Sequence, residues 1–117
     1  MSWTPTVVQA WALLGLAILL EVVGTTCMKL ADGFSNWGPA ALMFGCYALA
    51  FACNTLVVRT LDLSVTYAVW SGVGTLLTAV VGILWFKEPA TVLKLVSIGL
   101  IVIGVMGLHG AARAAAA

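Results

Sequence analysis

The first long apolar stretch of the chain contains one carboxylate. Between Thr6 and Met28, Glu21 is the only acidic or basic side chain. About 20 apolar residues, each rising ~1.5 Å along a helix, cross the ~30 Å hydrocarbon core of a bilayer, so this stretch predicts a membrane helix with Glu21 inside it. A charged residue there costs on the order of 3 kcal/mol and usually carries an ion, a proton or a charged ligand. Glu21 is therefore predicted to bind a proton or a cation; the alternative is a neutralised acid that only holds helices together.

Small and polar residues share the predicted helix face of Glu21. At helical spacing from it lie Leu14, Ala17, Ile18, Gly24, Thr25 and Met28. Gly24 either allows another helix to approach or leaves space beside the carboxylate, and Thr25 offers a hydroxyl. Lys29 lies about 12 Å farther along the helix axis, so we expect it to reach the membrane surface rather than pair with Glu21.

Aromatic side chains on two later stretches are further candidates for ligand binding. Tyr47 and Phe51 are four residues apart and share a helix face, which is typical either of core packing or of a cavity wall. Tyr67 and Trp70 are three residues apart, and their ring faces are able to attract a cation. The alternative for Tyr67 and Trp70 is the aromatic belt that these residue types form at membrane surfaces.

The composition excludes several classes of protein. With 117 residues, of which 63% are hydrophobic and 8% charged, the chain is too apolar for a soluble domain and is predicted to be an integral membrane protein. The formal charge of +1 gives no electrostatic case for nucleic-acid binding. Cys27, Cys46 and Cys53 lie in apolar segments without metal-ligand spacing, so we expect packing residues and no metal site.

Four hydrophobic segments define the predicted architecture. They cover residues 7–29, 39–58, 65–86 and 91–109. The short polar breaks leave no room for a domain outside the membrane, so residues 1–117 are predicted to form one all-α domain of four transmembrane helices. The first segment is longer than the apolar part of a typical signal peptide, and we expect it to be retained. The tail, residues 111–117, has nothing apolar to dock and is predicted to be disordered.

Small residues mark the third and fourth segments. The fourth carries Gly99, Gly104, Gly107 and Gly110 among aliphatic residues. Because small residues let helix backbones approach closely in a membrane, this face is predicted to pair with another helix. On the third segment, Gly72 and Gly74 predict either close packing or a bend.

Two motif blocks resemble the small multidrug resistance family. Residues 21–29 read EVVGTTCMK, Gly33 and Phe34 follow, and residues 67–74 read YAVWSGVG. The similarity extends over nearly the whole chain, with matching helix order and breaks. It implies a bacterial inner-membrane protein, not an enzyme, that pairs as an antiparallel homodimer and exchanges protons for cationic substrates. It implies no cofactor, because the proton gradient drives the exchange.

The resemblance also implies roles for individual residues. Glu21 would bind proton and substrate in alternation, with Tyr67 and Trp70 lining the site. The other implied members of the site are Tyr47 at its wall, Gly24 and Thr25 beside the acid, and Ser71 within the second motif. Gly99, Gly104 and Gly107 would join the two protomers.

The residues after Glu21 bear on the substrate. Gly-Thr-Thr at 24–26 looks like the quaternary-ammonium branch of the family, whereas guanidinium exporters typically have Trp-Ala there, so hydrophobic cations are the predicted substrates. Two stretches depart from that branch. Asp62-Leu63-Ser64 replaces the usual Pro-x-Gly, and Phe86-Lys87-Glu88-Pro89 is similar to the guanidinium branch. The alternatives to export of hydrophobic cations are guanidinium export, a proton or cation channel, and a non-transporting bundle subunit.

The cationic residues predict two orientations in the membrane. Four helices place Arg59 and Arg113 on one side and Lys29, Lys87 and Lys94 on the other. Because Lys and Arg in short loops set orientation, two against three gives almost no bias. Antiparallel copies would supply alternating access for a chain too short to contain its own inverted repeat.

Overall fold

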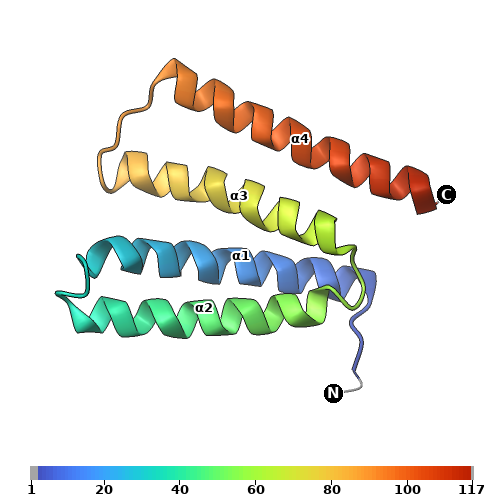
Figure 1. Ribbon diagram of the computed structural model, residues 1–117, viewed down its shortest axis with the longest axis horizontal. Coiled ribbons are helices and arrows are strands. Elements are labelled where there is room, and N and C mark those ends of the chain that lie inside the picture. The colour runs from blue at the N-terminus through green and yellow to red at the C-terminus, as the bar shows by residue number, and fades with distance from the viewer. Residues whose placement is uncertain (1–2, 117) are drawn as a thin grey trace. The chain divides into compact units, whose positions relative to one another are not determined.

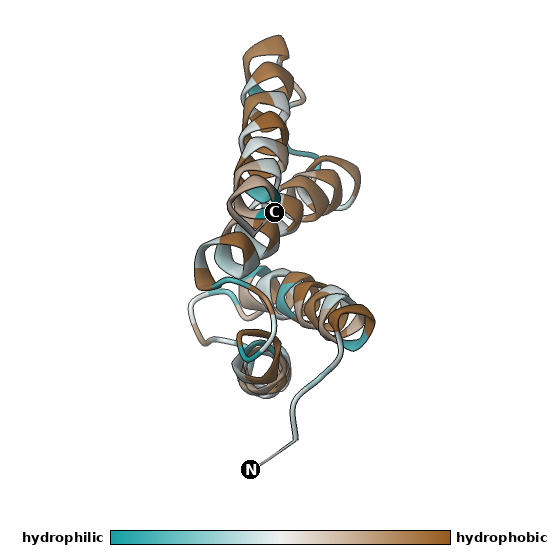
Figure 2. Ribbon diagram, turned by 90° about the vertical axis from the view of Figure 1, so that its right-hand side faces the viewer, coloured by the Kyte–Doolittle hydropathy of each residue, from teal (hydrophilic) through white to brown (hydrophobic). Residues whose placement is uncertain are grey.

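The computed structural model describes residues 3–116, and its regular structure is helical (Figure 1). Within that range lie α1 (Val7–Leu30), α2 (Trp37–Val57), α3 (Leu63–Leu84) and α4 (Val92–Ala116). Each helix is long and apolar enough to cross a membrane, and Figure 2 shows predominantly hydrophobic helices. The predicted all-α membrane fold with four transmembrane helices is confirmed. The chain divides into two compact units, Met1–Leu61 with α1 and α2, and Asp62–Ala117 with α3 and α4.

α1 and α2 form an antiparallel pair in the first unit (Figure 1). Buried small residues recur every seven positions along this part of the chain, at Ala10, Ala17, Gly24 and Ala31. Residues at this spacing lie on one stripe of a helix, and their small side chains let a neighbouring backbone come close. The buried residues of α2 are Ala40, Met43, Cys46, Ala50 and Val57. The stripe brings Gly24 against the middle of α2.

A tight turn joins α1 to α2. Asp32, Gly33 and Phe34 have φ angles of 48°, 64° and 70°, a run of left-handed conformations that is uncommon for residues other than glycine. The turn is closed by Asn36, whose backbone N–H donates to Ala31 O at 3.0 Å. The Phe34 ring also stacks on Phe44 of α2, with centroids 6.2 Å apart. These contacts hold the strained turn and reverse the chain direction.

The segment before α1 is tied to the segment after α2. The Arg59 Nε–H donates to Thr4 Oγ1 at 3.3 Å, and the Thr60 hydroxyl donates to the Pro5 carbonyl at 2.6 Å. Thr6 then caps α1 through a reciprocal pair of bonds with Gln9. The first unit therefore closes on itself at both ends of the helical pair.

In the second unit α3 packs against α4 at a glycine. A Cβ built on Gly72 would lie 2.6 Å from Val105 Cγ2 and 3.4 Å from Ile101 Cγ2, which leaves no room for a larger residue. Of the two sequence interpretations of this glycine, close packing is the one observed.

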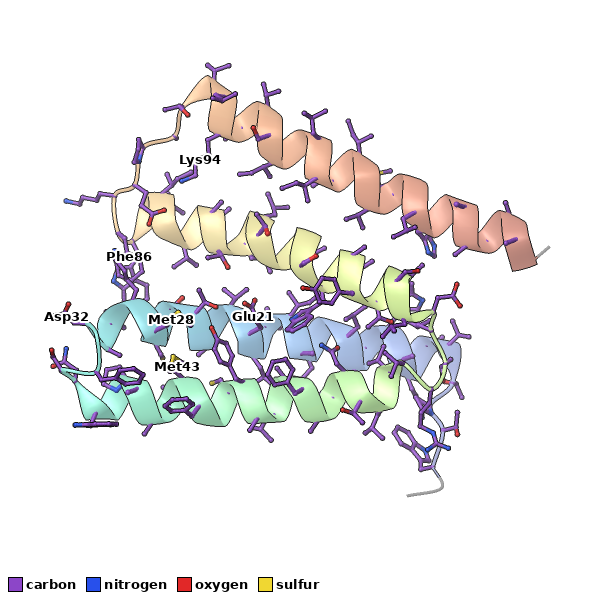
Figure 3. The ribbon with its side chains drawn as sticks, viewed as in Figure 1. Glu21, Met28, Asp32, Met43, Phe86 and Lys94 are labelled. Carbon is purple, nitrogen blue, oxygen red and sulfur yellow. The ribbon has the colours of Figure 1, made fainter. Side chains whose placement is uncertain are left out.

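The connection from α3 to α4 folds back on the end of α3. Glu88 N–H donates to Gly82 O at 2.9 Å, and the Glu88 carboxylate covers Gly82. Lys94 Nζ lies 3.5 Å from Glu88 Oε1, and Figure 3 shows Lys94 at the start of α4 pointing toward this connection. Thr91 accepts the Lys94 backbone N–H at 3.1 Å and so caps the first turn of α4.

The helix boundaries agree with the predicted segments within two residues, except at the end of α4. Pro39 lies in the first turn of α2, where its missing N–H costs nothing. Residues 111–117 were predicted to be disordered, but α4 continues to Ala116, and residue 117 lies outside the described residues. The physical reason is that alanine has the highest helix propensity and Arg113 in the last turn favours the helix dipole.

α4 leaves its glycines open within the chain. A Cβ built on Gly99, Gly104 or Gly107 meets nothing within 4 Å. In the described span Val92–Ala115, the most apolar stretch contains no residue buried inside the chain. The pairing predicted for this face is therefore not with α3, the other helix of the same unit.

Candidate functional site

Glu21 lies midway along α1, and its carboxylate is held by the next turn of the same helix (Figure 3). The Thr25 hydroxyl donates to Glu21 Oε1 at 3.0 Å. Residues four apart on a helix are neighbours on its surface, which is why the two side chains meet. The expectation that Thr25 offers a hydroxyl to the acid is confirmed.

Tyr47 of α2 reaches the same hydroxyl. Its phenolic oxygen lies 2.7 Å from Thr25 Oγ1, so a chain of hydrogen bonds runs from Tyr47 through Thr25 to Glu21. All three side chains are partly buried. Two helices thus place one carboxylate and two hydroxyl groups in a row.

Gly24 makes room for the Tyr47 ring. A Cβ built on Gly24 would lie 2.6 Å from Tyr47 Cε1, 2.8 Å from Tyr47 Cδ1 and 3.4 Å from Cys46 Cβ. Real Cβ atoms essentially never approach a ring this closely, so the tyrosine occupies the space that any other residue at position 24 would need. The close helix approach suggested by the sequence at Gly24 is the arrangement observed.

Tyr67, Trp70 and Ser71 lie near one another on α3 in the second unit. The Tyr67 and Trp70 rings meet edge to face, with centroids 5.8 Å apart at 87°. Tyr67 is 63% exposed, and the Ser71 hydroxyl donates to Ala68 O at 3.4 Å. The two residues, three apart in the sequence, thus lie side by side on α3, and the exposed Tyr67 ring presents an aromatic surface.

Two further side chains near the ends of the paired helices lie away from the acid. Phe44 of α2 stacks on Phe34 of the first turn and so supports the turn. Lys29 is exposed in the last turn of α1. Among the described residues, no three His, Cys, Asp or Glu side chains gather as a metal site would require.

The link between Tyr47 and Thr25 was not foreseen from the residues. The signal that could have found it is the seven-residue repeat of small residues on α1, which places Gly24 on the stripe facing α2. Tyr47 of α2 lies opposite Gly24, and it reaches the hydroxyl of the next residue, Thr25, across the space that the glycine leaves. Chemically, the assembled row can hold a proton on the carboxyl or leave it charged for a cation.

The chain is similar to proteins of known type over most of its length. The family model described as "Small Multidrug Resistance protein" matches residues 9–101. A Bacillus subtilis protein called "Uncharacterized membrane protein YvaE" is 48% identical over 85% of this chain and 83% of that protein. "Multidrug resistance protein EbrA" of Bacillus atrophaeus is 45% identical over 82% and 91%. "Quaternary ammonium compound-resistance protein QacG" of a Staphylococcus species is 35% identical over 80% and 88%.

Proposed function

Because the chain belongs to the small multidrug resistance family, we propose that it exports hydrophobic and quaternary ammonium cations in exchange for protons. The names of the relatives support this substrate class, since one refers to quaternary ammonium compounds and another to multidrug resistance. The protein then acts as a transporter and not as an enzyme. It needs no cofactor, because the proton gradient drives the exchange. Its multi-pass fold and its bacterial relatives support a place in the bacterial inner membrane.

The observation that carries the proposal is the Glu21 carboxylate, midway along a membrane-length helix and hydrogen-bonded to Thr25. A carboxylate at this depth is costly unless it is neutralised, and either a proton or a bound cation neutralises it. Since both need the same group, the two ligands exclude each other. Exclusive binding is what couples export of a cation to entry of protons.

The aromatic pair on α3 supplies the second part of the proposed site. Ring faces of Tyr and Trp attract cations by about 0.5–2 kcal/mol, and they accept ligands of many shapes. Tyr67 and Trp70 are therefore proposed to line the substrate site, with Ser71 beside them in the same motif. Tyr47, Thr25 and Gly24 complete it around the acid.

We propose that two copies of the chain work together. The open face at Gly99, Gly104 and Gly107 supports a helix-to-helix contact with a second copy. The balance of Lys and Arg on the two sides favours neither orientation, so the partners are proposed to be antiparallel. Two inverted copies around one chamber would expose it to each side of the membrane in turn.

The test uses purified protein in proteoliposomes with an imposed proton gradient. Uptake of a quaternary ammonium dye and of guanidinium is measured side by side, for the unchanged protein and for Glu21→Gln. We expect gradient-driven dye uptake that Glu21→Gln abolishes while the variant still inserts and extracts normally. Glu88→Gln is the matched control, because Glu88 is the other glutamate of the chain and lies outside the helices.

Each alternative has its own outcome in this assay. Transport of guanidinium but not of the dye would favour a guanidinium exporter, the branch of the family that residues 86–89 resemble. Proton flux without substrate exchange would favour a channel. Coupled transport that survives Glu21→Gln would reject the proposed mechanism.

A further inference from the structure

We propose that Thr25 relays the protonation state of Glu21 to the hydroxyl of Tyr47 on the neighbouring helix, and that Gly24 is the positioning residue that makes this relay possible. The inference rests on the proposed function and specifies how the proton acts beyond the carboxyl group itself. It follows from counting donors along the row Glu21, Thr25 and Tyr47.

With Glu21 ionised, only one arrangement of donors satisfies the row. A threonine hydroxyl has a single hydrogen, and Thr25 gives it to the Glu21 carboxylate at 3.0 Å. The 2.7 Å contact between Thr25 and Tyr47 then requires Tyr47 to be the donor. The phenolic proton is thereby engaged inside the protein, and the lone pairs of the phenolic oxygen are left for other partners.

Protonation of Glu21 permits the reverse arrangement. The carboxyl group gains a hydrogen that it can donate to Thr25, and Thr25 can turn its own hydrogen to Tyr47. Each hydroxyl keeps its proton and only rotates about its C–O bond, so the single proton added is the one on Glu21. The Tyr47 oxygen now accepts, and its hydrogen is released to point elsewhere.

The reversal changes the electrostatic interaction between the Tyr47 hydroxyl and a cation. A phenolic oxygen that offers lone pairs attracts positive charge, whereas one that has accepted a hydrogen bond and directs its own hydrogen outward repels it. When the row reverses, the proton on Glu21 has removed the negative carboxylate, and the Tyr47 hydroxyl now repels a cation as well. Both effects have the same sign, so the relay strengthens the exclusion between proton and substrate.

Gly24 determines whether the row exists. Tyr47 reaches Thr25 by passing over position 24, at a distance where an added Cβ would lie 2.6 Å from its ring. An alanine at this position pushes the ring away without removing any hydroxyl. Gly15 on the same helix meets nothing within 4 Å of an added Cβ, which makes Gly15→Ala the matched control.

On α1 and α2, few other groups change charge. The titratable side chains besides Glu21 and Tyr47 on the paired helices are Cys27 and Lys29 on α1 and Cys46 and Cys53 on α2. α2 contains no Asp, Glu, Lys, Arg or His. Among these groups, Glu21 is the source of a change at Tyr47 that follows the carboxyl and not a thiol or Lys29.

The experiment is a ¹³C NMR titration of the full chain in lipid bilayers, with tyrosine labelled at Cζ and glutamate at Cδ. The chain contains two tyrosines, Tyr47 and Tyr67, and two glutamates, Glu21 and Glu88, so each spectrum has two signals that single variants assign. We expect the Tyr47 Cζ shift to titrate with the same midpoint as Glu21 Cδ. A Tyr47 signal that stays constant while Glu21 titrates would overturn the relay.

Variants separate the relay from a direct effect of charge. In Thr25→Val, Glu21 should still titrate but the Tyr47 response should fall below half, and Thr25→Ser should restore it. Gly24→Ala should lose the response as Thr25→Val does, whereas Gly15→Ala should keep it. An undiminished Tyr47 response in Thr25→Val would show that the charge acts through space and would overturn the proposal.

A binding measurement gives the functional consequence. The ratio of cation affinities at high and low pH should shrink by roughly fivefold in Tyr47→Phe, the value of one ordinary hydrogen bond. An unchanged ratio would mean that Tyr47 does not act on the substrate. The outcomes stay distinct from those of the antiport test, because the transporter can exchange protons for cations with the relay absent, and the relay can titrate in a protein that fails to transport.

Discussion

Glu21 makes cation binding depend on pH by competition for one group. A proton on the carboxyl removes the charge that a cation needs, so substrate affinity should fall as the pH is lowered, by up to about tenfold per pH unit where one proton is displaced per cation. Equilibrium binding of a quaternary ammonium dye from pH 5 to pH 9 measures this. A flat affinity across that range would contradict the competition.

The aromatic pair should matter for binding more than for folding. Tyr67→Ala or Trp70→Ala removes a ring face, and cation affinity should fall by the equivalent of about 0.5–2 kcal/mol, or roughly two- to thirtyfold. Because Tyr67 is largely exposed within its own unit, its loss should change the unfolding temperature little. Variants that lose stability but still bind the dye would identify the pair as a membrane-surface belt instead.

The sequence alone identified the acid of the site but not all of the hydrogen bonds around it. Glu21 could be recognised because a charge inside an apolar helix is conspicuous, and Thr25 followed from helical spacing. Tyr47 was assigned a place at the site through resemblance, but its bond to Thr25 depends on how α1 and α2 cross. Spacing along one helix carries no information about register between two helices, so this contact needed the structure.

At the level of helices, Gly72 allows α3 and α4 to pack closely. Gly72→Ala would place a Cβ 2.6 Å from Val105 Cγ2, and overpacking of this kind costs about 1–3 kcal/mol. We expect a lower unfolding temperature in detergent, measured by circular dichroism, and recovery when Val105→Ala is added. Gly45→Ala, at a glycine with open space around it, is the control. Equal stability of Gly72→Ala and Gly45→Ala would contradict this packing.

Helix ends were predicted well where polar residues with Gly or Pro follow the apolar segment, and poorly where alanines follow it. Polar turns with Gly or Pro end the apolar segments near Leu30 and Leu84, and the structure follows them. After Gly110 the apolar signal stops, but nothing in the alanine-rich sequence breaks a helix. Hydropathy reports where a membrane segment ends, whereas propensity decides where the helix ends, and on α4 the two differ.

For the whole molecule we expect both orientations in one membrane. Single cysteines placed in the first connection and in the C-terminal tail, in a background without Cys27, Cys46 and Cys53, should each react with an impermeant reagent from both sides. The balanced Lys and Arg count is the physical reason. Reaction of each position from one side only would remove the basis for an antiparallel pair, and with it this account of how so short a chain alternates its access.

The bonds from Arg59 to Thr4 and from Thr60 to Pro5 also bear on how far the two halves of the protein depend on each other. They join residues 55 positions apart in the chain, and all four residues belong to the first unit. The helical hairpin of α1 and α2 therefore closes without any residue of α3 or α4, so the first half of the chain contains every contact of its own closure.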